Sequence, residues 1–155
     1  MRNHPVLSML AAALIAIAIV GVLGFLLAAP LSGYVNPLDP NTSLDLWRSK
    51  FQQVVAYSAA ACALLSVLWL VLAHGGRGHG TKSGEWILLL GLSMLTSAVL
   101  VWLIPPNLRE GLPYPLGVMA LLSGLGYWLS TLFMTPDHYR YTPWFAWALF
   151  GKRRV

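Results

Sequence analysis

The chain has 155 residues, of which 57% are hydrophobic and only 10% are charged, and its formal net charge is +5. A soluble domain carries about 25% charged residues, so a water-soluble fold of this composition would expose large apolar patches and aggregate. Apart from one run at 152–154 the basic residues are thinly spread. The composition therefore favours a membrane protein over a nucleic-acid-binding one.

Four long apolar windows contain no Asp, Glu, Lys, Arg or His, at residues 6–29, 54–73, 86–104 and 116–134. A helix needs about 20 apolar residues to cross about 30 Å of hydrocarbon, so each window predicts one membrane span. The connecting segments are short and leave no room for a second domain. We therefore predict a single all-α domain over residues 1–155, an integral membrane four-helix bundle.

The first window is much longer than the roughly 7–15 apolar residues of a signal peptide, so we expect a retained span. Pro5 suits a first helical turn, where its missing N–H breaks no helix hydrogen bond. Pro30 is expected to stop this helix near Ala29.

The second helix is expected to begin outside the hydrocarbon. Residues 42–45 read Thr-Ser-Leu-Asp, which is typical of a capping box with a hydroxyl group followed three residues later by a carboxylate. We predict an unbroken helix from Ser43 through Ala73, with Trp47 and Phe51 at the outer membrane interface.

The two later connections differ in composition. Residues 74–85 are rich in glycine and are not expected to be helical. Residues 105–115 contain Pro105, Pro106, Pro113 and Pro115. Because each proline fixes φ and removes a donor, we predict a stiff turn that holds the third and fourth helices as an antiparallel pair.

The last segment, residues 135–155, has an aromatic stretch that is too short to span and is followed by basic residues. Aromatic side chains beside cationic ones are typical of a segment that lies in the membrane interface. The predicted interface anchors are Trp144, Trp147, Lys152, Arg153 and Arg154.

Charge sets the expected orientation. With four spans both termini lie on one side, which together with the middle loop carries seven Lys or Arg residues, against three on the opposite side. Basic loops favour the cytoplasm, so we predict cytoplasmic N and C termini. The basic excess also predicts binding to anionic lipid of the cytoplasmic leaflet.

Helices in lipid associate where small residues allow close contact. The fourth window carries two such stripes, one of Gly117, Ala120 and Gly124, the other of Ser123, Gly126 and Ser130. One stripe can face the bundle while the other faces a partner, or both can pack internally, and the sequence leaves the two arrangements open.

The spans contain few side chains that could act in catalysis or bind a cofactor. Cys62 is the single cysteine and lacks the second sulfur that disulfide exchange requires. No histidine lies within a window, which argues against haem, and no carboxylate marks a proton pathway. The four histidines fall on one predicted side without zinc-ligand spacing, at His4, His74, His79 and His138. We assign no cofactor, no metal and no catalytic residue.

By exclusion we predict a non-catalytic accessory or structural subunit of a larger bacterial inner-membrane complex, in a secretion, conjugation or energy-transducing assembly. Its partners would be other membrane-protein subunits. One alternative is a small-solute transporter or channel, lined by Tyr57, Ser58, Thr96 or Tyr127. The second alternative is an envelope-lipid enzyme, for which the candidate residues are His138, Arg140 and Tyr141.

Overall fold

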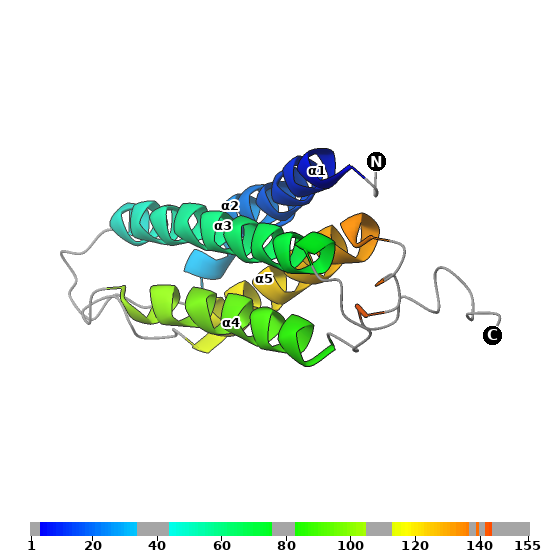
Figure 1. The fold of residues 1–155 in the computed structure, drawn as a ribbon. Coiled ribbons are helices and arrows are strands. Elements are labelled where there is room, and N and C mark those ends of the chain that lie inside the picture. The colour runs from blue at the N-terminus through cyan, green and yellow to red at the C-terminus, as the bar shows by residue number, and fades with distance from the viewer. Residues whose placement is uncertain are drawn as a thin grey trace.

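The computed structural model describes residues 4–33, 44–75, 83–104, 113–136, 139, 142 and 143. Within these residues the regular structure is all helical, and four helices are long and apolar enough to cross a membrane. This agrees with the predicted all-α, multi-pass membrane bundle. The elements, shown in Figure 1, are α1 (Pro5–Ile17), η1 (Ala18–Leu23), α2 (Gly24–Ser32), α3 (Leu44–Gly75), α4 (Ser83–Trp102) and α5 (Pro113–Met134).

The first span is one rod, Pro5–Ser32, made of α1, η1 and α2. Consecutive spans run in opposite directions, so α3 and α5 are parallel to each other (Figure 1). The start of α1, the end of α3, the start of α4 and the end of α5 therefore lie at the same end of the bundle.

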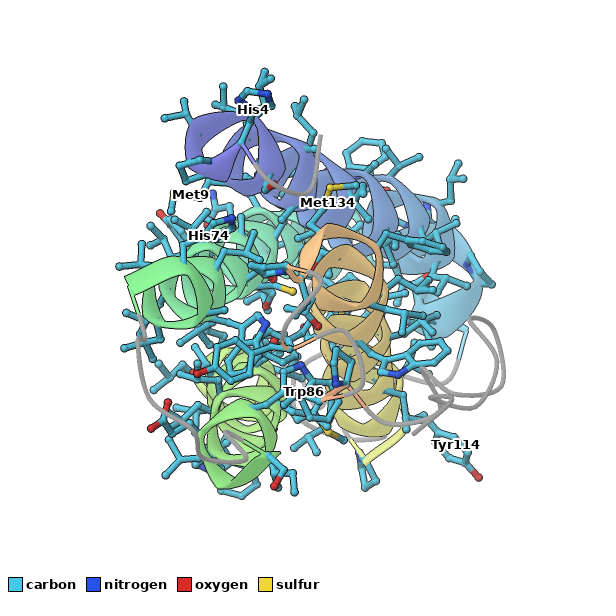
Figure 2. The ribbon with its side chains drawn as sticks, turned by 45° about the vertical axis from the view of Figure 1, so that its right-hand side comes forward. His4, Met9, His74, Trp86, Tyr114 and Met134 are labelled. Atoms are coloured by element: carbon cyan, nitrogen blue, oxygen red, sulfur yellow. The ribbon has the colours of Figure 1, made fainter. Side chains whose placement is uncertain are left out.

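The helices α3 and α5 form the centre of the bundle. Half of each of their apolar windows is buried, against 22% for the first span and 28% for α4. The first span and α4 each pack on both central helices, and they lie on opposite sides of that pair (Figure 2). The first span and α4 therefore present most of their surface to the surroundings, which in a membrane is lipid.

The first helix does not stop near Ala29, and the prediction that Pro30 ends it is wrong. Helix α2 continues to Ser32 with Pro30 inside it. Pro30 has no N–H to donate to the Leu26 carbonyl, so the helix loses one hydrogen bond there and continues for only two more residues. The Ser32 hydroxyl donates to the Ala29 carbonyl at 2.6 Å, and the Gly33 N–H donates to the Pro30 carbonyl at 3.2 Å.

Helix α3 is unbroken, as predicted, and runs from Leu44 to Gly75. Trp47 and Phe51 are fully buried and stack with ring centroids 4.9 Å apart. They fill one end of the core, where their rings pack against the other helices. At the same end Arg48 donates to the Ser32 hydroxyl at 3.1 Å, which links α3 to the end of α2.

The fourth span, helix α5, begins earlier than the apolar window that predicted it. Pro113 is its first residue and Pro115 lies in its first turn, so the prediction that both belong to the outer turn is wrong. The first N–H groups of a helix have no intrahelical acceptor, so proline is tolerated there. Residues 34–43, 76–82 and 105–112, and the predicted anchors Trp144, Trp147, Lys152, Arg153 and Arg154, lie outside the described residues.

Candidate functional site

Buried hydroxyl groups line the contact between α3, α4 and α5. We call this set the hydroxyl seam, and each of its members is at most 1% exposed. Its members are Ser58, Ser66, Ser93, Ser97, Ser123, Ser130, Thr131 and Thr135. Because hydrocarbon offers no hydrogen-bond partners, polar groups in such a bundle must bond to each other or to water.

Ser123 of α5 is the meeting point of the three helices. Its hydroxyl is hydrogen-bonded to that of Ser97 of α4. Its carbonyl accepts from the Ser93 hydroxyl at 3.3 Å and from the Cys62 thiol of α3 at 3.5 Å. Cys62 is buried and takes part in interhelical packing.

Two turns further along α5, the seam joins α5 directly to α3. The Ser66 and Ser130 hydroxyls are 2.8 Å apart. Each hydroxyl also lies within hydrogen-bonding distance of a carbonyl of its own helix, Ser66 of Cys62 at 2.9 Å and Ser130 of Tyr127 at 3.0 Å. Because each hydroxyl has one proton, one serine donates across to the other helix while the second donates to its own carbonyl. Such local bonds satisfy a serine hydroxyl inside a helix.

Two tryptophans close the seam at the end where α5 finishes. The Trp69 indole N–H donates to the Thr135 hydroxyl at 2.9 Å, and the Trp86 indole N–H donates to the Thr131 hydroxyl at 3.0 Å. Both indoles are fully buried, and a buried tryptophan needs such an acceptor. The Trp86 ring also packs on Tyr127, with centroids 5.7 Å apart.

Glycines set how closely the first span approaches the centre. A Cβ at Gly126 of α5 would lie 2.7 Å from Val20 Cγ2 and 3.4 Å from Cys62 Sγ. A Cβ at Gly24 of α2 would lie 2.8 Å from Val55 Cγ1 of α3. The contact with Gly126 falls within the π-helix η1, and such segments often occur where a helix makes a functional or strained contact.

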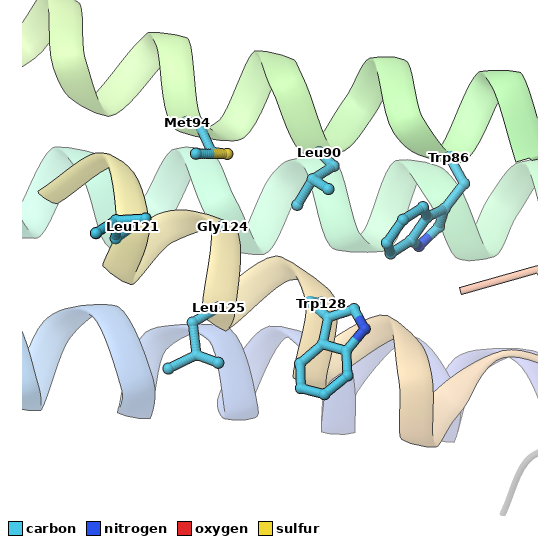
Figure 3. A pocket seen from close by; sticks show the side chains of 7 residues that line it. All are labelled: Trp86, Leu90, Met94, Leu121, Gly124, Leu125 and Trp128. Carbon is cyan, nitrogen blue, oxygen red and sulfur yellow. The ribbon is translucent and has the colours of Figure 1, made fainter. Parts of the chain in front are cut away.

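An apolar groove of about 350 Å³ opens between α4 and α5 (Figure 3). Gly124 is a buried residue of its lining and packs against α4, since a Cβ there would lie 3.1 Å from both Cγ and Sδ of Met94. Leu121 and Leu125 at its rim are 68% and 42% exposed. The lining residues are Trp86, Leu90 and Met94 from α4 and Leu121, Gly124, Leu125 and Trp128 from α5.

The structure separates the two predicted stripes of α5. Ser123, Gly126 and Ser130 are buried inside the bundle and contact the other helices. Gly124 is also buried, against Met94 at the edge of the groove, whereas a Cβ at Gly117 would meet nothing within 4 Å. Ala120, the third residue of this stripe, is partly buried. Sequence reasoning did not find Trp69, Trp86, Thr131 and Thr135, although hydroxyl residues in an apolar window were a visible signal.

The residues named for the alternative functions are not gathered in one place. Ser58 and Tyr127 are fully buried, whereas Tyr57 is 64% exposed and Thr96 is partly exposed. Over the described ranges, no group of three His, Cys, Asp or Glu residues is close enough to hold a metal ion. His79, His138, Arg140 and Tyr141 lie outside those ranges.

A second groove, of about 330 Å³, lies between the first span and α3 near Gly21, Phe25 and Ala59.

Comparison of the chain with protein-family models, curated proteins and solved structures finds no match.

Proposed function

We propose that the chain is a non-catalytic subunit of a larger membrane complex, and that the α4–α5 groove receives a transmembrane helix of another subunit. The observation that carries this proposal is the apolar groove itself, whose α5 rim residues Leu121 and Leu125 are exposed. Helices in lipid associate where the surface allows close approach, and here the buried Gly124 already packs against Met94, so that α4 and α5 form the two walls of one hollow.

The dimensions of the groove support a helix as the occupant. Its α4 wall runs from Trp86 to Met94, which is about 12 Å of helix at roughly 1.5 Å per residue. Two turns of a partner helix would fit along this length and present side chains at three or four residue intervals. A lipid acyl chain is the competing occupant, and co-purification of a protein partner distinguishes the two.

The seam supports an assembly role over chemistry or transport. Most of its hydroxyl groups are engaged with each other or with helix carbonyls. The four apolar windows carry no charged residue, whereas coupled transport usually depends on an ionisable group within the membrane. These features favour a packed scaffold whose outer surface contacts its partners.

The proposal extends to location and orientation. We infer that the membrane is a bacterial inner membrane and that both termini face the cytoplasm, because seven basic residues lie on that side against three on the other. We infer that the basic residues on this side also bind anionic lipid of the cytoplasmic leaflet. The complex would be a secretion, conjugation or energy-transducing assembly.

The test is gentle detergent extraction of the tagged protein, followed by mass spectrometry of co-purifying chains. We expect stoichiometric membrane-protein companions, and we expect Gly124→Leu to remove them because a side chain at position 124 would collide with Met94 and displace it into the groove. Gly117→Leu is the matched control, since it lies two turns away on the same helix in open space. Leu121→Trp narrows the groove from its exposed rim and should act like Gly124→Leu without altering the interior.

Each variant is checked for a wild-type melting temperature, so that lost binding is not confused with unfolding. A wild-type protein that purifies without companions would overturn the proposal, and so would full retention of companions by folded Gly124→Leu. Solute flux through the purified protein alone in liposomes would instead favour the transporter.

A further inference from the structure

Two fully buried hydroxyl groups have no hydrogen-bond partner among the residues that the structure describes. They belong to Ser58 on α3 and Tyr127 on α5, and both residues are 0% exposed. Leaving a buried hydroxyl without a partner is unfavourable even in a soluble protein. In a membrane bundle no outside solvent relieves that penalty.

Local bonding does not explain either group. Within this bundle Ser66 and Thr131 satisfy their hydroxyls on carbonyls four residues earlier, at 2.9 and 2.8 Å. Ser58 is on the same helix as Ser66 and makes no such bond. A tyrosine hydroxyl is too far from its own backbone to use this route, so Tyr127 needs a partner from elsewhere in the seam.

Both residues lie one helical turn from the contact between Cys62 and Ser123. Ser58 lies one turn before Cys62 on α3, and Tyr127 lies one turn after Ser123 on α5. The Cys62 thiol donates to the Ser123 carbonyl at 3.5 Å, and the Ser93 hydroxyl donates to the same carbonyl at 3.3 Å. A bound water molecule needs two to four polar partners, and this contact places a thiol, a carbonyl and hydroxyl groups one turn from each of the two residues.

We propose that the hydroxyl seam binds water, with one enclosed site at the Tyr127 hydroxyl and another at the Ser58 hydroxyl. Each water molecule accepts from or donates to the orphaned hydroxyl and bonds to neighbouring seam groups. The bundle then has a hydrated polar centre inside an apolar shell. This inference does not depend on the groove or on any partner.

Water-edited solid-state NMR of the protein in bilayers tests the sites directly. We expect magnetisation from water to reach the Tyr127 ring carbons and the Ser58 Cβ several times faster than it reaches the Met119 methyl group. Met119 is also 0% exposed and belongs to the apolar core, so it is the dry reference. Equal build-up rates at the three positions would overturn the proposal.

Substitution gives a second test, because the melting temperature shifts in opposite directions for a hydroxyl that binds water and for one that is unpaired. If Tyr127 binds water, Tyr127→Phe loses those hydrogen bonds and lowers the melting temperature by about 2–4 °C; a truly unpaired hydroxyl would make the same change raise it. Ser58→Ala is expected to behave in the same way. The control is Tyr57→Phe, whose side chain is 64% exposed, and it should leave the melting temperature unchanged. A rise for either buried variant contradicts its site.

Discussion

Gly126→Leu is expected to destabilise the bundle by about 3 kcal/mol or more, the upper end of overpacking effects in cores. Even the Cβ atom would lie 2.7 Å from Val20 Cγ2, which is closer than carbon atoms approach in folded proteins. Val20 is 0% exposed and β-branched, so it has few rotamers to which it can move. Leucine would therefore push η1 away from α5.

The measurement is the free energy of unfolding in mixed micelles, from an SDS titration followed by far-UV circular dichroism. Gly117→Leu on the same helix is the control, and it should stay within about 0.5 kcal/mol of wild type, because a Cβ at position 117 would have no neighbouring atom within 4 Å. Equal stability of the two variants would show that the first span does not pack against α5 as described.

Trp86→Ala is expected to cost about 3–5 kcal/mol, as for other large aromatic side chains removed from cores. The substitution removes a fully buried ring, its contact with Tyr127 and its hydrogen bond to Thr131. The Thr131 hydroxyl keeps its bond to the Tyr127 carbonyl at 2.8 Å. The loss is therefore dominated by the cavity left behind, not by a stranded polar group.

Trp102→Ala is the matched control at the other end of α4. Its side chain is 56% exposed, so truncation leaves no cavity and should change the free energy of unfolding much less. Both variants are measured by the same titration. A larger loss for Trp102→Ala than for Trp86→Ala would contradict the placement of Trp86 in the core.

Trp86 also connects the interior to the proposed docking surface. Its indole N–H bonds to the seam at Thr131, while its ring lines the α4–α5 groove. The position of one groove wall is therefore set by a hydrogen bond inside the bundle. This arrangement follows the general rule that a binding surface is best held by residues whose own conformations are fixed from behind.

The spans were predictable from the sequence because a charged residue in hydrocarbon is costly, so charge-free windows are a direct signal. Helix ends were less predictable. Pro30, Pro113 and Pro115 all lie inside helices. Pro113 and Pro115 lie in a first turn, where a missing N–H breaks no helix hydrogen bond, whereas Pro30 removes one bond shortly before its helix ends. A window of apolar residues does not show how far a helix continues beyond it.

The contacts were predictable in kind but not in pairing. Small residues on α5 indicated close packing, yet the sequence does not show that Gly126 meets η1 while Gly124 lies against Met94. The hydrogen bond between Trp69 and Thr135 joins residues far apart in the chain. Such pairings depend on how each helix is rotated about its own axis. The apolar windows show where the helices are but not which face of each one meets its neighbours. The π-helix at Ala18–Leu23 likewise has no visible pattern.

Photo-crosslinking in intact membranes tests the central claim of partner binding most directly. A photoreactive phenylalanine analogue replaces Leu125, which lines the groove, or Leu64, which is 71% exposed on α3 and does not line it. We predict one discrete protein adduct from position 125, reduced by Gly124→Leu and missing from position 64. Adducts to lipid alone at position 125, or the same protein adducts at both positions, would contradict a specific helix in the groove.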